Sequence, residues 1–102
     1  MPTLTITSIN CRETSNGMGA DDLYILVNGQ KIFSAEVDEG ENPQVNFQMQ
    51  FTKHAIIQVW EDDSGSDDDF LGQHQVNPEP LGETSFAVDG DGSDYTINYV
   101  VS

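Results

Sequence analysis

The residues with the clearest chemical potential are the carboxylates of one short segment, residues 61–72, which reads EDDSGSDDDFLG. Six carboxylates fall within its first nine residues: Glu61, Asp62, Asp63, Asp67, Asp68 and Asp69. At an effective dielectric constant of about 20, two like charges about 4 Å apart repel by about 4 kcal/mol. Such a segment is therefore stable either when it is spread out in water or when a cation lies among its oxygen atoms.

The ligand types in this segment favour calcium as that cation. Carboxylate oxygens are hard ligands, and residues 61–72 contain neither Cys nor His, which zinc and copper sites use. Magnesium is the second candidate, although it demands a stricter octahedral geometry and retains more water. The segment that begins at Asp89 is not an EF-hand loop, because Asp94 takes the place of the required glycine and Val100 that of the closing glutamate.

Apolar and polar residues alternate in short segments on both sides of this loop, and such alternation predicts β-strands. We predict eight strands, over residues 3–11, 23–27, 30–37, 45–51, 55–60, 70–76, 83–88 and 94–101. Asn28 and Gly29 predict a tight hairpin, because both residues accept positive φ. No window shows helical periodicity. The expected fold is all-β, an eight-stranded antiparallel β-sandwich that forms a single domain over residues 1–102.

The acidic residues are concentrated in alternate connections between the predicted strands. If successive strands are antiparallel, the connections after the first, third, fifth and seventh strands lie at the same end of the sandwich. These connections, residues 12–22, 38–44, 61–69 and 89–94, hold 15 of the 18 acidic residues. Solubility alone would spread the charge over the surface. The segregation therefore predicts a cation site at one end.

The overall charge excludes several classes of partner. The net charge is −15, and the basic residues are Arg12, Lys31 and Lys53 alone. Nucleic acids are not expected as partners, because phosphate contacts need clustered basic side chains. Direct docking on anionic lipid is disfavoured for the same reason. We see no signal peptide and no stretch of transmembrane length, so the expected location is the cytosol, or the chain is a module of a larger protein.

Four segments share their order and spacing with a known family. Residues 59–72 match a loop in which Asp-x-Asp follows a hydrophobic-aromatic pair and an Asp precedes an aromatic-aliphatic-Gly sequence. Residues 22–25 are similar to an Asp-Pro-Tyr-Val strand start, and Asn16 lies six residues upstream, where that family often has Asp. Residues 42–51 are similar to an Asn-Pro-x-Trp-Asn segment that leads into a Phe-x-Phe strand. Together these segments resemble the calcium-binding C2 domain.

This resemblance implies a C2-like Greek key whose first and third calcium loops carry the metal ligands. The implied ligands are the side chains of Asn16, Asp22, Glu61, Asp63 and Asp69, the backbone carbonyl of Asp62, and a carboxylate of Asp67 or Asp68. Glu61 and Asn16 both stand where the family usually has Asp, and Leu23 stands where it has Pro. The basic groove with which some relatives bind phosphoinositides has no counterpart in this sequence.

The leading functional hypothesis is a calcium-dependent binding module. Bound calcium would order the loops and bridge to a lipid head group, a sugar hydroxyl or a protein carboxylate, and the sequence leaves this target and the oligomeric state open. A lectin-like carbohydrate-binding sandwich with structural calcium is the alternative, which exposed aromatic residues near the acidic end would favour. A third class is a metal-free scaffold that recruits a basic partner. We expect no enzyme, since no nucleophile–histidine arrangement and no phosphate-binding glycine loop occurs.

Some smaller expectations concern single residues. We expect Trp60 to be a sheet residue that packs against the acidic loop rather than contacting a ligand, and Cys11 to be a small buried hydrophobe. His54 and His74 are expected on the surface. Residues 89–94 form either a tight turn with side-chain hydrogen bonds or a fourth arm of the metal site.

Overall fold

The computed structural model describes residues 1–15, 19–63, 65 and 67–102. Its strands are β1 (Thr3–Glu13), β2 (Asp21–Val27), β3 (Gln30–Val37), β4 (Gln44–Gln50), β5 (Ala55–Glu61), β6 (Asp69–Val76), β7 (Leu81–Val88) and β8 (Asp94–Val101). One turn of 3-10 helix, η1 (Gly90–Gly92), lies between β7 and β8. The eight predicted strands are confirmed, each to within two residues at either end. No described helix is long and apolar enough to cross a membrane.

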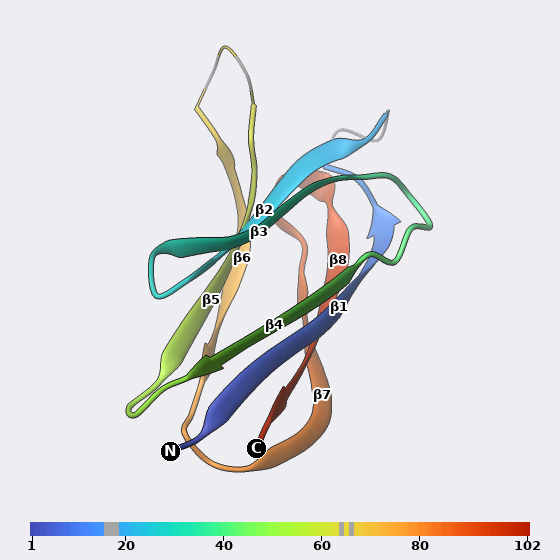
Figure 1. The fold of residues 1–102 in the computed structure, drawn as a ribbon. Helices are drawn as coiled ribbons and strands as arrows, with labels where there is room; N and C mark the ends of the chain where they lie inside the picture. Colours follow the sequence, from blue (N-terminus) through green and yellow to red (C-terminus); the bar gives the residue numbers. More distant parts are fainter. Residues whose placement is uncertain (16–18, 64, 66) are drawn as a thin grey trace.

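The strands form two four-stranded sheets that pack face to face (Figure 1). Sheet A has the order β4-β1-β8-β7 and sheet B the order β3-β2-β5-β6, and every neighbouring pair is antiparallel. The predicted antiparallel sandwich is therefore confirmed. Each sheet takes two strands from each half of the chain, so strands distant in sequence become direct neighbours.

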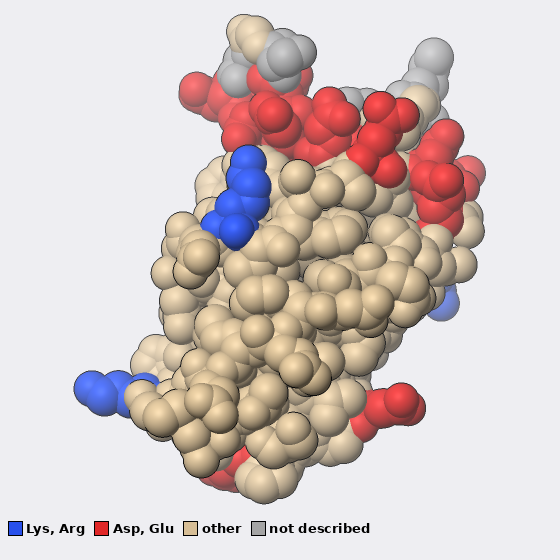
Figure 2. All heavy atoms as spheres, viewed as in Figure 1, with Lys and Arg blue, Asp and Glu red and all other residues tan. Residues whose placement is uncertain are grey.

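The connections after β1, β3, β5 and β7 lie at one end of the sandwich, as strand direction predicted (Figure 1). We call this end the acidic tip; among the described residues it consists of 14–15, 19–20, 38–43, 62–63, 65, 67–68 and 89–93 with the strand ends that flank them. Acidic side chains cover this end in Figure 2, and few appear on the rest of the face shown. The fold thus gathers carboxylates from four separate segments.

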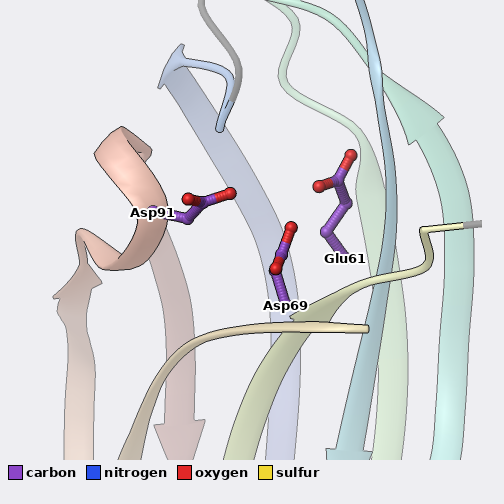
Figure 3. Close-up of side chains that lie close together, drawn as sticks. All are labelled: Glu61, Asp69 and Asp91. Carbon is purple, nitrogen blue, oxygen red and sulfur yellow. The ribbon is translucent and has the colours of Figure 1, made fainter. Parts of the chain in front are cut away.

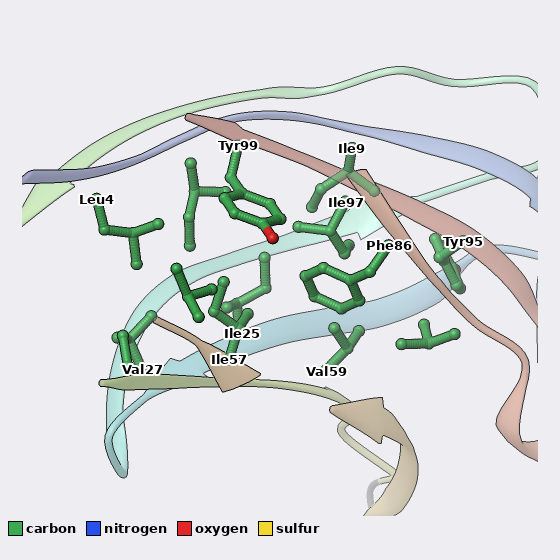
Figure 4. Close-up of a cluster of buried hydrophobic side chains, with 14 of the residues drawn as sticks. Leu4, Ile9, Ile25, Val27, Ile57, Val59, Phe86, Tyr95, Ile97 and Tyr99 are labelled. Carbon is green, nitrogen blue, oxygen red and sulfur yellow. The ribbon is translucent and has the colours of Figure 1, made fainter. Parts of the chain in front are cut away.

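The core lies between the sheets and is built from alternate residues of each strand. In β2 the buried side chains are Leu23, Ile25 and Val27, and β5 and β8 show the same alternation (Figure 4). In β1 the buried set changes phase between Ile6 and Ile9, because a bulge lies between Ile6 and Ser8. One continuous hydrophobic cluster results, and it holds the ends of all these strands in fixed positions at the tip.

Several local predictions can be compared directly with the structure. Asn28 and Gly29 have φ values of 49° and 83°, so the predicted hairpin turn is confirmed. Cys11 is buried as expected, and His54 is exposed. The surface prediction for His74 is wrong: the residue is half-buried, because its ring stacks on Phe86 with centroids 4.7 Å apart.

Candidate metal centre

Three carboxylates converge at the acidic tip, and we call them the carboxylate triad: Glu61, Asp69 and Asp91. One oxygen from each lies within 4.8 Å of the other two, and the side chains point toward a common space in Figure 3. Calcium–oxygen bonds measure about 2.3–2.6 Å, so two ligands on opposite sides of an ion are about 4.6–5.2 Å apart. All three oxygens are therefore close enough together to contact one ion.

The triad is positioned by the junction of β5 and β6. Glu61 ends β5 and pairs with Asp69, the first residue of β6. Glu61 follows Ile57 and Val59 at a spacing of two, so its side chain lies on the buried face and is only 6% exposed. A carboxylate therefore occupies the position where the core pattern of β5 would place another apolar residue.

Asp91 reaches the triad because β6 and η1 approach each other closely. A Cβ atom built on Gly90 would lie 2.6 Å from the Phe70 carbonyl oxygen and 2.7 Å from the Leu71 Cα. Only glycine therefore fits at this contact. Asp91 itself has φ 54°, a left-handed conformation that Asp tolerates better than most residues. The turn between β7 and β8 thus brings a carboxylate to the triad, and it is also a tight turn in which the Ser93 hydroxyl donates to the Gly90 carbonyl at 2.7 Å.

A buried hydrogen-bond network lies beside the triad and is centred on Asp21. This side chain is 1% exposed and accepts hydrogen bonds from the Ser15 backbone N–H at 2.8 Å and the Tyr95 hydroxyl at 2.5 Å. The Ser15 Oγ lies 2.8 Å from Asp21 Oδ1 and also 2.8 Å from Glu61 Oε1. Burial and hydrogen bonding to Asp21 raise the pKa of Tyr95, which keeps this hydroxyl a donor.

The Ser15 hydroxyl has a single proton but faces two carboxylates. If it donates to Asp21, the contact with Glu61 is a hydrogen bond only when Glu61 carries a proton and donates to Ser15 Oγ. Burial, together with the charge of Asp21, raises the pKa of Glu61 from 4.5 to about 7. Without a cation, Glu61 should therefore be mostly protonated only below about pH 7.

A second member of the triad, Asp69, also shows the effect of neighbouring like charges. Desolvation and the neighbouring charge of Asp91 raise the pKa of Asp69. Both effects disfavour the ionised form, and a bound cation would reverse them because it favours ionised ligands. The site is thus electrostatically unfavourable when it holds carboxylates alone.

Other carboxylates of the tip are exposed. Those from the predicted ligand set are Asp22, Asp62, Asp63, Asp67 and Asp68. Asp68 accepts hydrogen bonds from the Tyr24 hydroxyl at 2.5 Å and the Asp63 backbone N–H at 3.2 Å. The bond from Tyr24 lowers the pKa of Asp68, and desolvation together with that bond raises the pKa of Tyr24 to about 12.

The predicted ligand set is therefore divided by the structure. Glu61 and Asp69 belong to the triad, the five exposed residues do not, and Asn16 lies outside the described residues. Sequence analysis missed Asp21. A signal for it was present, because Asp21 stands two residues before Leu23 and so continues the buried face of β2, while Asp22 falls on the opposite face.

Comparison with known proteins identifies the fold. No protein-family model matches the chain, and no curated protein matches it by sequence. A solved structure of a C2 domain aligns with a TM-score of 0.61 at 19% identity, covering 100% of this chain and 99% of that one. A calcium-bound structure of two C2 domains of Extended-Synaptotagmin 2 gives a TM-score of 0.62 at 17% identity, covering 99% of this chain and 44% of that one.

A third similar structure is human GIVD cytosolic phospholipase A2, with a TM-score of 0.59 at 11% identity; the alignment covers 98% of this chain and 14% of that one. The chain thus spans less than half of the two larger structures and nearly all of the single C2 domain. It has a C2-like fold, as the resemblance of residues 16–72 implied.

Proposed function

We propose that this chain is a calcium-binding module whose ion is held at the acidic tip by Glu61, Asp69 and Asp91. The observation that carries the proposal is the convergence within 4.8 Å of three carboxylates from the end of β5, the start of β6 and the turn η1. Their hard oxygens are the ligands that calcium prefers. Calcium would supply the positive charge that allows the triad to ionise together, and the protein would supply a rigid frame from β5, β6 and η1.

Calcium usually takes six to eight oxygens, so a triad alone would not complete its shell. Asp63, Asp67 and Asp68 are exposed on the β5–β6 connection and are the nearest candidates in sequence for further ligands. Asp22, Asn16 and the backbone carbonyl of Asp62 complete the set that the family resemblance implies. The calcium-bound structure of similar fold supports this assignment by analogy.

Coordination positions that the protein leaves open would bridge to a partner. A phosphate oxygen of a lipid head group is the target that we propose, since the net charge of −15 disfavours any direct approach to anionic lipid without the ion. Sedimentation with vesicles that contain phosphatidylserine tests this step. Binding is expected in calcium and not in chelator, and equal binding in both contradicts the bridge.

The calcium site is tested by thermal unfolding in calcium, magnesium and chelator at fixed ionic strength. Calcium at about 100 times its Kd should stabilise the fold by about 2.7 kcal/mol, because it binds the folded state alone. For a domain of this size, that corresponds to a rise in Tm on the order of 10 °C. Asp69→Asn and Asp91→Asn should each lose most of this rise.

The matched control is Glu79→Gln, which removes one charge from the connection between β6 and β7, at the end away from the tip. This variant should keep the full calcium response. No shift of Tm at millimolar calcium would overturn the proposal. An equal loss of the response in all three variants would show that net charge, rather than the triad, determines it.

A further inference from the structure

Three aromatic side chains form a row across the outer face of sheet B, directly below the acidic tip. Tyr24 of β2 pairs in register with Trp60 of β5, and Trp60 with Phe70 of β6. The ring centroids of Tyr24 and Trp60 are 6.4 Å apart with planes 9° apart, and those of Trp60 and Phe70 are 5.0 Å apart. Phe70 is 44% exposed. Trp60 is a sheet residue, as expected, and its ring contacts those of the two neighbouring strands, but the row also presents aromatic surface to solvent.

Carboxylates border this row on the side toward the tip. A hollow of about 290 Å³ adjoins Tyr24, and its lining includes Asp22, Glu36 and Asp62. Asp22 pairs with Glu36 across β2 and β3, and both side chains are exposed. Asp22 precedes Tyr24 by two residues in β2, so it lies on the same face as the row, on the side toward the tip. Aromatic rings and several carboxylates therefore share one face.

A cation already occupies part of this face. The Lys31 ammonium lies 4.4 Å from the centroid of the Tyr24 ring, and it also lines the hollow. This internal contact shows that the geometry of the row suits a cation placed over a ring. The neighbouring rings of Trp60 and Phe70 offer the same chemistry with more exposure at Phe70.

We propose that the aromatic row and its carboxylate border bind an extended basic peptide. Guanidinium groups would stack on Trp60 and Phe70 and pair with the carboxylates above them, which combines two attractions that reinforce each other. In an extended peptide, alternate side chains lie on one face about 6.6 Å apart, and long arginine side chains can reach the Trp60 and Phe70 rings, whose centroids are 5.0 Å apart. Arginine at alternate positions is therefore the pattern that fits.

Charge favours this occupant over the others that use aromatic surfaces. The protein carries a net charge of −15, which raises the encounter rate with a basic peptide and repels an anionic lipid surface. A neutral sugar would gain the contact with the rings but nothing from the surrounding carboxylates. The row lies on the outer face of sheet B, whereas Glu61 lies on its buried face. The rings are thus apart from the triad, although Asp22 and Asp62 of the border are also candidate calcium ligands, and peptide binding is expected in chelator.

Trp60 is the single tryptophan of the chain, so its fluorescence reports binding at the row directly. The probe is acetyl-(Arg-Ser)₄-amide, compared with the equally charged acetyl-(Lys-Ser)₄-amide, in chelator at physiological salt. A saturable fluorescence change is expected with both peptides, with tighter binding of the arginine peptide, because the planar guanidinium stacks on rings better than an ammonium group.

Phe70→Leu keeps an apolar side chain at this position and removes the aromatic ring. It should weaken the binding affinity for the arginine peptide by about two- to five-fold, which is the range for an exposed cation–π contact. Leu81→Ala is the matched control, because Leu81 is 47% exposed but begins β7 at the opposite end. This control should bind the peptide as the parent does. The calcium response in thermal unfolding should survive in both variants.

The proposal is overturned if both peptides bind equally and Phe70→Leu has no effect, since this is the behaviour of a surface that attracts charge alone. It is also overturned if neither peptide changes the fluorescence of Trp60, or if a neutral oligosaccharide such as cellohexaose does so while the peptides do not. Failure of the calcium response in the parent protein would overturn the metal site without affecting this proposal.

Discussion

At the acidic tip, two pairs of carboxylates that are adjacent in sequence differ in burial within each pair. Asp21 and Asp22 are adjacent in sequence, as are Glu61 and Asp62, yet one member of each pair is buried and the other is exposed. We call Asp21 and Glu61 the inner pair, and Asp22 and Asp62 the outer pair. The inner pair meets through Ser15, and the backbone N–H of Asp62 donates to the carbonyl of Asp22 at 2.8 Å.

The difference comes from strand alternation. Successive side chains of a strand point to opposite faces, so a step of one residue moves a carboxylate from water into the space between the sheets. There it must find hydrogen-bond donors, carry a proton or bind a cation. Asp21 finds hydrogen-bond donors in Ser15 and Tyr95. The pKa of Glu61, raised to about 7, fits a carboxyl group that carries a proton. The same residue type therefore has a structural role on one face and a surface role on the other.

The largest predicted effect is a difference in stability between variants of the neighbouring residues Asp21 and Asp22. Asp21→Ala leaves the Ser15 N–H and the Tyr95 hydroxyl buried without their acceptor. We expect it to reduce the free energy of unfolding by about 3–5 kcal/mol. Asp22→Ala should change it by less than about 0.5 kcal/mol, because Asp22 is exposed. Urea unfolding in chelator measures both, and similar losses in the two variants would contradict the division into inner and outer pairs.

The second prediction concerns pH in the absence of metal. The folded-state pKa of Glu61, about 7, lies above its ordinary value of 4.5, so the folded protein binds more protons between these values. Stability from this group is complete below about pH 4.5 and is lost as the pH rises through 7, a change of about 3 kcal/mol. The raised pKa of Asp69 acts in the same direction.

Glu61→Gln should flatten this pH profile, because the amide can donate to Ser15 Oγ at every pH. It should therefore be more stable than the parent above pH 7 in chelator, and it should also lose the calcium response. Asp62→Asn removes the same charge from the outer pair and should keep the slope of the parent. Urea midpoints at several pH values measure the profiles, and parallel slopes in the parent and Glu61→Gln would contradict the protonation of Glu61.

A smaller effect is expected at the contact that brings Asp91 to the triad. Gly90→Ala places a Cβ 2.6 Å from the Phe70 carbonyl oxygen, so η1 must move away from β6. A loss of about 1–3 kcal/mol is typical of such overpacking. The calcium-dependent rise in Tm should also fall, since Asp91 moves with the turn. Gly82→Ala is the control, because a Cβ there meets nothing within 4 Å; equal effects of the two changes would exclude the close approach as the cause.

Much of the fold could be predicted because its signals are local. Alternation of apolar residues gave all eight strands, and the Asn28-Gly29 turn fixed the hairpin between β2 and β3. Antiparallel order then placed four acidic connections at the same end without any tertiary information. The phase change in β1 was also encoded, because the apolar positions change from even to odd between Ile6 and Ile9.

The site could be predicted only in part. Asp21 was missed because the strand was expected to begin at Leu23, two residues after the observed start of β2. Asp91 was left undecided, because its approach to Asp69 depends on how η1 packs against β6 rather than on anything in residues 89–94 alone. The aromatic row likewise depends on the register of β2, β5 and β6, which brings together residues that are up to 46 positions apart.

By itself, then, the sequence determined an antiparallel sandwich with its negative charge at one end, since periodicity and turn residues act over a few residues. The tertiary structure alone decided which carboxylates share a space, because that depends on which strand ends become neighbours and on which face each side chain lies. The number of charges can be read from the sequence. The free-energy cost of burying a carboxylate, and hence its need for a cation, depends on the packing around it.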